Sequence, residues 1–420
     1  MKRLVVYLNG RRVGILTDAD EPVFAYDAGW LAGDGSYPLC RQLPLRSEAF
    51  SGRVVRGFFG GLLPEADPRD RIASILGISA GNDFALLERI GGECAGAVSL
   101  MPEETAGQPS SQGNLRWLSD DGLSNIIRRL PQRPLMAGED GLRMSLAGAQ
   151  IKLPVVIAGD TPGETMRVAL PLDNTPTTYI IKPEPGRFPG LVANEAWCLA
   201  LARHIGLQAA EAWAQTIAGS PCLIVRRYDR VTVAGEGVTR RLHQEDFCQA
   251  MGYPANRKYQ QEGGPSLREC FAMVREWSTA PVLDIKALLD AVIFAAIIGN
   301  ADAHAKNQSF IYADGSRRMA PLYDQVCTLA WPELSKALSM KIGSAGSLEE
   351  VSPEHFKQLC AEAKLGWPMV RERLANLCTK IVDAIREAEM RTQDVTVDCP
   401  ARPLVLSRAE RMLRLIQANF

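Results

Sequence analysis

The start of the chain has the residue pattern of a β-hairpin. Leu4, Val6 and Leu8 share one face of an extended segment, because side chains alternate across a strand. The pair Asn9-Gly10 favours a tight turn, after which the apolar residues at 13–16 can form the returning strand. Further elements of this region, one strand and two helices, are predicted at 21–26, 68–76 and 83–90. Together they predict an N-terminal α/β subdomain over residues 1–112.

The pattern changes after a segment at 102–114 whose Pro, Gly, Ser and Gln content is typical of a linker. Ser119 can cap a helix with a single apolar stripe, and short strands dominate from there to residue 229. The strands and one helix of this part are predicted at 143–156, 177–182, 223–228 and 194–205. Residues 113–229 are therefore predicted to form a strand-rich lobe.

The remaining segment, 230–420, is predicted to be mainly helical. Its segment 285–298 is apolar almost all round, which indicates a helix buried within a lobe. A hairpin is predicted around Asp314-Gly315, with strands at 309–312 and 318–322. Three later helices are predicted at 353–363, 369–389 and 407–418.

Composition excludes several classes of protein. Hydrophobic residues make up 46% of the 420 residues and charged residues 23%, which is ordinary for a folded soluble chain. Lys and Arg number 47 against 48 Asp and Glu, so the net charge of -1 excludes a globally basic nucleic-acid coat. The apolar run 291–298 is too short to cross a bilayer, and the run 4–8 is too short for a signal-peptide core. We therefore expect a cytoplasmic protein without membrane contact.

Metal chemistry based on cysteine is not expected either. The 10 cysteines include no CxxC pair and the 4 histidines are scattered, so the spacing does not favour a zinc site. In a reducing compartment such cysteines are mostly small buried apolar residues.

A polar segment after the predicted buried helix carries the strongest chemical signal. Asp302 can accept the proton of an attacking hydroxyl, Asn307 can ligate a metal bound to phosphate, and Lys306 can offset phosphoryl charge. Asp324 follows the predicted hairpin and can serve as the main magnesium ligand. Each residue also has a simpler interpretation, namely a polar turn at Asp302–Asn307 and a strand-ending carboxylate at Asp324.

Two further features lie upstream. Lys182 ends a predicted strand and can hold ATP phosphates, while Glu195 on the next helix can pair with it. Alternatively, Glu195 is only an acid favoured by the first turn of a helix. The small residues at 145–152 can bring backbone amides to a phosphate, or can form an ordinary hairpin turn.

The order of these features is more informative than any one of them. A small-residue loop, a strand lysine, a helix glutamate, an Asp…Asn segment and a later Asp follow one another as in protein-kinase-like phosphoryl transfer. The HRD, DFG and APE motifs are absent, which indicates a divergent branch. The predicted fold is therefore α+β: a bilobal protein-kinase-like fold, with a strand-rich N-lobe and a helical C-lobe, preceded by the α/β subdomain.

Several phrases of the sequence resemble the HipA family, the bacterial serine/threonine kinase toxins of type II toxin–antitoxin systems. The phrases are SLAGAQIK at 145–152, YIIK at 179–182, NE at 194–195, RYDR at 227–230, QEDFCQ at 244–249, DAHAKN at 302–307 and PLYD at 321–324. The segments FFGGLLPE at 58–65 and GGECAGA at 91–97 are similar to the N-terminal domain of that family. The likeness covers nearly the whole chain and is weakest at 103–134 and beyond about residue 330.

The resemblance implies a role for each matched position. Asp302 would be the catalytic base, Asn307 and Asp324 would hold Mg²⁺, and Ser145 would be an inhibitory autophosphorylation site. The implied ATP-binding residues are Ala147, Gly148, Ala149, Gln150, Ile151, Lys152, Lys182, Glu195, Arg226, Arg227, Tyr228, His304, Ala305, Lys306, Asn307, Tyr323 and Asp324.

The resemblance also implies partners. Family members phosphorylate proteins such as aminoacyl-tRNA synthetases, notably the glutamyl enzyme. They also bind a small helix-turn-helix antitoxin, HipB-like, which dimerises on operator DNA. Two other functions stay open: a weakly active kinase-fold corepressor, and a kinase for a small molecule. Direct contact with DNA is expected to be modest. The candidate residues for such contact are Lys380, Arg386, Arg408, Arg411 and Arg414, which can alternatively form a solvated helix face.

Overall fold

The structure is a computed structural model that describes residues 1–106, 114–159, 165–172, 174–232, 239–387, 391–392, 395–396 and 399–419. The chain forms two compact units. The first unit comprises Met1–Pro183, Gln215–Asn256 and Ile311–Gly315. The second comprises Glu184–Ala214, Arg257–Phe310 and Ser316–Phe420. The three-part division predicted from the sequence stays a prediction.

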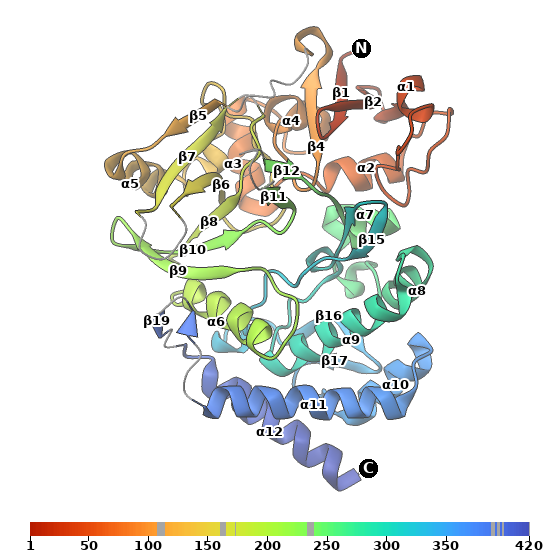
Figure 1. The fold of residues 1–420 in the computed structure, drawn as a ribbon, viewed down its shortest axis with the longest axis vertical. Helices are drawn as coiled ribbons and strands as arrows, with labels where there is room; N and C mark the ends of the chain where they lie inside the picture. Colours follow the sequence, from red (N-terminus) through yellow and green to blue (C-terminus); the bar gives the residue numbers. More distant parts are fainter. Residues whose placement is uncertain are drawn as a thin grey trace. The chain divides into compact units, whose positions relative to one another are not determined.

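The first unit begins with an antiparallel sheet of order β3-β2-β1-β4, and the helices α1 to α4 lie between β3 and β4 along the chain (Figure 1). The predicted hairpin is confirmed, because Leu8 pairs with Arg11 across Asn9 and Gly10, whose φ angles are 50° and 76°. Leu4, Val6 and Leu8 enter the main apolar core of this part. The elements are β1 (Arg3–Leu8), β2 (Arg11–Thr17), β3 (Val23–Tyr26), β4 (Val98–Pro102), α1 (Ala28–Leu31), α2 (Arg53–Gly60), α3 (Ala66–Leu76) and α4 (Asp83–Ile90).

A second sheet has six strands in the order β5-β7-β6-β8-β10-β9 (Figure 1). The predicted cap is confirmed: the Ser119 side chain accepts a hydrogen bond from the Gly122 amide at the start of α5. Of the predicted linker, residues 107–113 lie outside the described part of the chain. The elements are β5 (Asn114–Trp117), α5 (Asp120–Arg129), β6 (Leu153–Ala158), β7 (Arg167–Leu172), β8 (Tyr179–Pro183), β9 (Ala212–Ile217), β10 (Ser220–Arg226), β11 (Arg230–Thr232), β12 (Thr239–Arg241), β13 (His243–Asp246) and α7 (Phe247–Met251).

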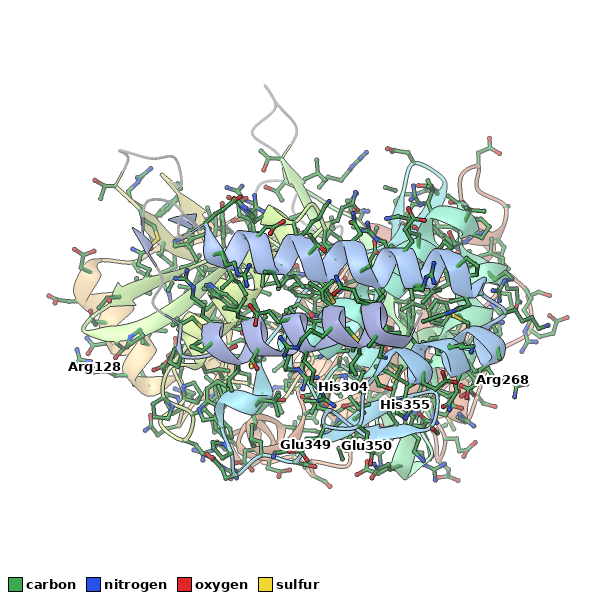
Figure 2. The ribbon with its side chains drawn as sticks, turned by 90° about the horizontal axis from the view of Figure 1, so that it is seen from below. Arg128, Arg268, His304, Glu349, Glu350 and His355 are labelled. Atoms are coloured by element: carbon green, nitrogen blue, oxygen red, sulfur yellow. The ribbon has the colours of Figure 1, made fainter. Side chains whose placement is uncertain are left out.

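The second unit is mainly helical, as predicted. Its central helix, α9 (Pro281–Ile298), is buried on nearly every face along 288–298, because that stretch is apolar apart from Asp290. Figure 2 shows α11 (Trp367–Arg386) and α12 (Arg402–Asn419) lying side by side. The other helices are α6 (Leu191–His204), α8 (Leu267–Trp277) and α10 (Pro353–Ala363). The helix predicted at 369–389 ends at Arg386, and its residues 388–389 lie outside the described part of the chain.

The remaining elements are short strands. The hairpin predicted around Asp314-Gly315 is confirmed, but its second strand begins earlier than predicted, at Ser316. The short strands are β14 (Ser309–Ala313), β15 (Ser316–Met319), β16 (Ala337–Ile342), β17 (Ala345–Ser347), β18 (Arg391–Thr392) and β19 (Val395–Thr396). None of the helices in the described ranges is both long enough and apolar enough to cross a bilayer.

Candidate active site

The segment that carries Asp302 is a rigid loop at the end of α9. The helix ends at Gly299, whose φ of 77° is the left-handed conformation that glycine commonly adopts after the last turn of a helix. The Asp302 amide donates to Asn300 Oδ1 at 3.0 Å, and the Asn307 amide nitrogen donates to the Asp302 carbonyl at 3.1 Å. The His304 amide also donates to the Asp302 carbonyl, at 2.8 Å. The backbone of Asp302 is therefore held at both its N–H and its C=O.

Two other segments of the second unit hold the same loop from outside. The Ala301 amide donates to Thr328 Oγ1 at 3.0 Å. The Ser339 hydroxyl donates to the Ala301 carbonyl at 2.7 Å. Asp302 is the one exposed residue of the segment 300–307. An exposed carboxylate on a fixed backbone is what a general base requires.

The Asp302 carboxylate already accepts a hydrogen bond from a hydroxyl. Tyr259 Oη donates to Asp302 Oδ1 at 2.9 Å, and the Tyr259 ring packs edge-on against His304 with centroids 5.6 Å apart. Tyr259 is a site residue that the sequence reasoning missed. It lies 43 residues before Asp302 and belongs to no motif quoted above, so the sequence offers no local signal for the contact.

Asp324 lies in an unusual backbone conformation next to this loop. Its φ of 51° is in the left-handed region, which Asp tolerates better than most residues. The preceding residue, Tyr323, donates from its hydroxyl to the Lys306 carbonyl at 2.7 Å and lies 2.6 Å from Ser309 Oγ. Tyr323, which precedes Asp324, is thus hydrogen-bonded directly to Lys306, which precedes Asn307. Strained conformations of this kind concentrate at functional sites.

Asn194 fixes the chain just after Asp324, a role that the sequence reasoning also missed. Its Oδ1 accepts from the Cys327 amide at 2.8 Å, and its Nδ2 donates to the Cys327 carbonyl at 3.1 Å. The quoted motif NE at 194–195 therefore contains one structural residue. The helix α6 begins at Leu191, so Glu195 is not in its first turn, and the alternative interpretation of Glu195 as a first-turn acid is wrong.

The donor set of Asn307 and Asp324 fits a magnesium ion. An amide oxygen and a carboxylate are hard oxygen ligands, and Mg²⁺ commonly takes only one or two protein ligands beside phosphate oxygens. Asn307 Nδ2 is already committed to the Asp302 carbonyl, which leaves Oδ1 as the ligand atom. No group of three or more His, Cys, Asp and Glu side chains suited to a metal occurs among the described residues. The predicted pair needs no such group.

The small-residue loop at 145–152 belongs to the first unit and is tied to its N-terminal part. Gly148 has a φ of 110°, and its carbonyl accepts from the Glu65 amide at 3.1 Å. Lys152 Nζ donates to the Ala147 carbonyl at 2.6 Å, which closes the loop on itself. A φ of 110° is a backbone conformation that residues with a Cβ rarely adopt, so glycine is favoured here.

Ser145 is completely buried. Its hydroxyl donates to the Leu62 carbonyl at 2.8 Å, and its amide donates to the Glu93 carbonyl at 2.8 Å. With 0% of the residue exposed, this hydroxyl cannot meet a kinase active site unless the segment is released. The predicted phosphorylation of Ser145 therefore requires that its segment first leave the buried position.

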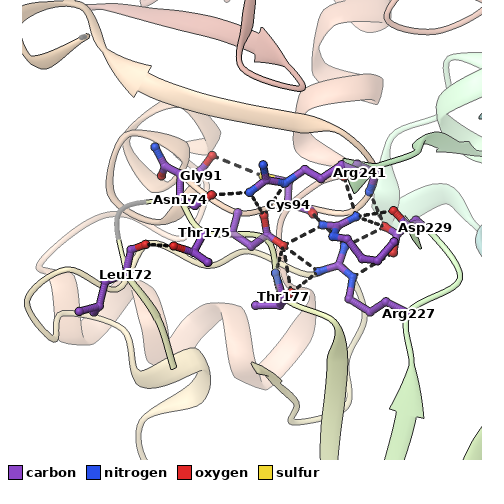
Figure 3. A network of polar contacts seen from close by, with 12 residues as sticks. Gly91, Cys94, Leu172, Asn174, Thr175, Thr177, Arg227, Asp229 and Arg241 are labelled. Carbon is purple, nitrogen blue, oxygen red and sulfur yellow. Dashed lines mark hydrogen bonds and ion pairs between the residues drawn. The ribbon is translucent and has the colours of Figure 1, made fainter. Parts of the chain in front are cut away.

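Glu93 is the centre of a buried network of charges in the first unit. Figure 3 shows this network, with Thr177, Arg227, Asp229 and Arg241 labelled. Arg230 and Arg241 each donate to its carboxylate at 2.8 Å, and Arg227 donates at 3.2 Å. Arg227 also donates to Asp229, at 2.9 Å and 2.8 Å. Burial alone would raise the pKa of Glu93, but the charges of Arg230, Arg241 and Arg227 outweigh burial and lower the pKa to about 2.

This network affects the segment predicted to contact adenine. The Arg227 side chain is committed to the network, so any contact with a nucleotide falls to its backbone. The Tyr228 hydroxyl donates to Gln244, and the exposed Arg226 guanidinium lies over the Tyr179 ring, 5.0 Å from its centroid.

Of the predicted site residues, one set is brought together within the second unit by the bonds described above: Asp302, His304, Lys306, Asn307 and Tyr323. Asp324 follows Tyr323 directly in the chain. Lys182, buried on β8, belongs to the first unit and Glu195 to the second, so their pairing stays a prediction.

The basic residues considered for DNA contact make internal contacts. Arg408 donates to the Ala296 carbonyl at 2.7 Å, and burial lowers its pKa. Arg386 pairs with Glu410 at 2.7 Å, and Arg411 approaches the Glu349 carbonyl at 3.4 Å. The interpretation of Arg408 as part of a solvated face is wrong, because its side chain joins α12 to α9.

Comparison with known proteins identifies two family domains in the chain. Residues 4–101 match the HipA N-terminal domain, and residues 144–388 match the HipA-like C-terminal domain. Putative kinase Y4mE of Sinorhizobium fredii is 44% identical over 402 residues, covering 94% of both chains. The serine/threonine-protein kinase toxin HipA of Shewanella oneidensis is 28% identical, covering 98% of this chain and 96% of that protein.

A solved structure agrees with these matches. HipA of Shewanella oneidensis MR-1, in a toxin–antitoxin complex with HipB and operator DNA, superposes with a TM-score of 0.84 and 26% identity. The match covers 99% of this chain and 98% of that chain. The predicted α+β fold with a kinase-like arrangement is confirmed by this likeness.

Proposed function

Because the chain belongs to the HipA family of kinases, we propose that it transfers the γ-phosphate of ATP to a serine hydroxyl of a cellular protein and acts as a growth-inhibiting toxin. The observation that carries the proposal is the Asp302 carboxylate, exposed on a loop whose backbone is held from both sides and already hydrogen-bonded by a hydroxyl. That geometry is the one in which a base accepts a proton from an acceptor hydroxyl.

The proposed roles follow from the chemistry of each residue. Asp302 takes the hydroxyl proton as the acceptor oxygen bonds to the γ-phosphorus and ADP leaves. Asn307 and Asp324 hold Mg²⁺, which offsets the charge of the phosphates when it is bound. Lys182, paired with Glu195, and the loop at 145–152 bind the phosphates. Lys306, His304, Ala305 and Tyr323 complete the nucleotide site on the side of Asp302.

Regulation and partners belong to the same proposal. The match to a HipA–HipB–operator complex supports a small helix-turn-helix antitoxin as partner, with DNA contacted mainly through it. An aminoacyl-tRNA synthetase such as the glutamyl enzyme is the proposed substrate. We assign Ser145 as an inhibitory autophosphorylation site. A phosphate of about -1.5 to -2 charges would break its bond to the Leu62 carbonyl and repel ATP phosphates.

The first experiment identifies the substrate. The phosphoproteome after induced expression of the wild type is compared with that of Asp302→Ala, so that only phosphosites that need the base remain. The proposal expects a serine in a translation enzyme among these sites. Identical phosphoproteomes for the two proteins would contradict kinase activity.

A second experiment separates base from metal ligand. Asp302→Ala and Asp324→Ala should both abolish transfer, but only Asp324→Ala should weaken the affinity for Mg-ATP in titration calorimetry, because the ion loses a charged ligand. Equal affinities in the two variants would refute this division of roles.

A further inference from the structure

The hydrogen bond between Tyr259 and Asp302 places a hydroxyl of the chain itself at the proposed base. The two oxygens are 2.9 Å apart, within the range of about 2.6–3.2 Å in which a general base takes a proton from its substrate. The contact is made at the surface, where Asp302 is exposed and Tyr259 is half-buried.

Hydrogen bonds fix the backbone of the loop that carries Tyr259. The Tyr259 carbonyl accepts from the amides of Glu262 at 3.0 Å and Gly264 at 2.9 Å. A Cβ at Gly264 would come within 2.4 Å of the Arg257 carbonyl, so the turn requires glycine. Gln260 Oε1 accepts from the Lys341 amide at 2.8 Å, which anchors the loop to β16. The tyrosine is therefore directed at Asp302 by the fold of its loop.

We propose that Tyr259 occupies the acceptor-hydroxyl position on Asp302 and must be displaced by the substrate serine, so that it determines which acceptors gain access to the base. This inference rests on the proposed function. A substrate hydroxyl and Tyr259 Oη donate a hydrogen bond to the same carboxylate, that of Asp302. Water, a weak phosphoryl acceptor, competes poorly with a phenol that the fold already holds there. Displacement is feasible because the hydrogen bond lies at the surface, where water or a substrate can replace it.

Tyr259→Phe is the variant that tests this, because it removes only the hydroxyl and keeps the ring that packs on His304. The full chain, carrying Ser145→Ala in every variant so that phosphorylation of Ser145 releases no ADP, is supplied with Mg-ATP alone, and ADP release is measured. In this reaction water bonds the γ-phosphorus, ADP leaves, and Asp302 takes the proton. We expect ADP release to rise about fivefold in the variant, since the hydrogen bond that shields the base is gone.

Tyr312→Phe is the matched control. It also removes a tyrosine–carboxylate hydrogen bond, to the buried Glu245, within the first unit. We expect this variant to lose stability without any rise in ADP release. Unchanged ADP release in Tyr259→Phe would overturn the proposal. So would a decrease, which would instead show that the tyrosine orients the base for catalysis.

A spectroscopic measurement separates this inference from the proposed function. 3-Fluorotyrosine placed at position 259 should shift its ¹⁹F resonance when Asp302→Asn replaces the carboxylate, whether or not the protein turns over ATP. No shift would refute the contact and the inference. A clear shift with no ATP turnover in wild type or Tyr259→Phe would refute the kinase function, and the access role with it, while leaving the contact established.

Discussion

Glu93 and Asp302 are both carboxylates at the centre of hydrogen-bond networks, yet their surroundings differ in kind. Glu93 is buried among three arginines, and each oxygen accepts from at least one of them. Asp302 has its backbone fixed, but its side chain is exposed and accepts a hydrogen bond from the Tyr259 hydroxyl. Removing a buried, fully paired carboxylate leaves its partners uncompensated and destabilises the fold, whereas a carboxylate with a held backbone and an open side chain can exchange protons with a substrate.

The largest expected effect is on catalysis at Asp302. Asp302→Ala should lower the rate of phosphoryl transfer by about 10³-fold, the contribution typical of a positioned general base. Its free energy of unfolding should change by less than about 0.5 kcal/mol, because the backbone bonds of the loop do not involve the carboxylate. Phosphate incorporation and urea unfolding measure the two quantities. Asp314→Asn, in an exposed turn, is the control that should change neither.

The opposite outcome is expected at Glu93. Glu93→Gln leaves three buried arginines facing a neutral group, so the free energy of unfolding should fall by about 3–5 kcal/mol. Urea unfolding followed by circular dichroism measures the loss. A loss below about 1 kcal/mol would show that the network contributes little to stability and would remove the contrast with Asp302.

The pH dependence of stability gives a smaller effect at His243. Burial lowers the pKa of this histidine from 6.5 to about 4, although its bond to the Leu39 carbonyl acts the other way. Between these values the unfolded chain binds a proton that the folded chain does not, so stability falls as the pH drops from 6.5 towards 4. At pH 5 the loss should be about 2 kcal/mol. His243→Gln should flatten the slope in this interval.

Glu93 supplies an internal reference for that measurement. Its pKa is lowered from 4.5 to about 2, so its contribution to stability is complete above pH 4.5 and is lost as the pH falls towards 2. The slopes due to His243 and Glu93 therefore fall in nearly separate pH intervals. A slope between pH 6.5 and 4.5 that persists in His243→Gln would assign the acid sensitivity to another group.

The smallest effect is expected for an exposed ion pair. Arg386 and Glu410 are 2.7 Å apart, but 63% of the Arg386 side chain is exposed. Arg386→Ala should cost less than about 1 kcal/mol, and the cost should shrink in high salt. Thermal unfolding at two salt concentrations tests this. A cost as large as that of Glu93→Gln would show that burial does not decide the value of a charge pair here.

The sequence predicted best those features that depend on neighbouring residues. The Asn9-Gly10 turn, the Ser119 cap and the apolar helix α9 each follow from local composition. The HipA family is also confirmed, because its motifs are short and ordered along the chain. The individual site roles stay predictions, although the bonds around Asp302, Asn307 and Tyr323 are consistent with them.

What could not be predicted depends on contacts between distant residues. Glu93 meets Arg227 across 134 positions, and Tyr259 meets Asp302 across 43, with no periodicity that links the partners. Arg408 has the spacing of a solvated helix face, yet it donates to a carbonyl of α9. Side-chain pairing of this kind is decided by tertiary packing, which a single sequence does not encode in any local pattern.

The left-handed backbone at Asp324 has a consequence for genetics. One nucleotide change converts an Asp codon to Asn, Gly, His, Tyr, Val, Ala or Glu, and of these Asn and Gly accept a φ of 51° most readily. Under the function proposed above, spontaneous alleles at this codon that survive expression of the chain would divide into two groups. Asn and Gly alleles would yield inactive protein at normal abundance, whereas Val alleles would also lower abundance, since a β-branched residue resists that conformation.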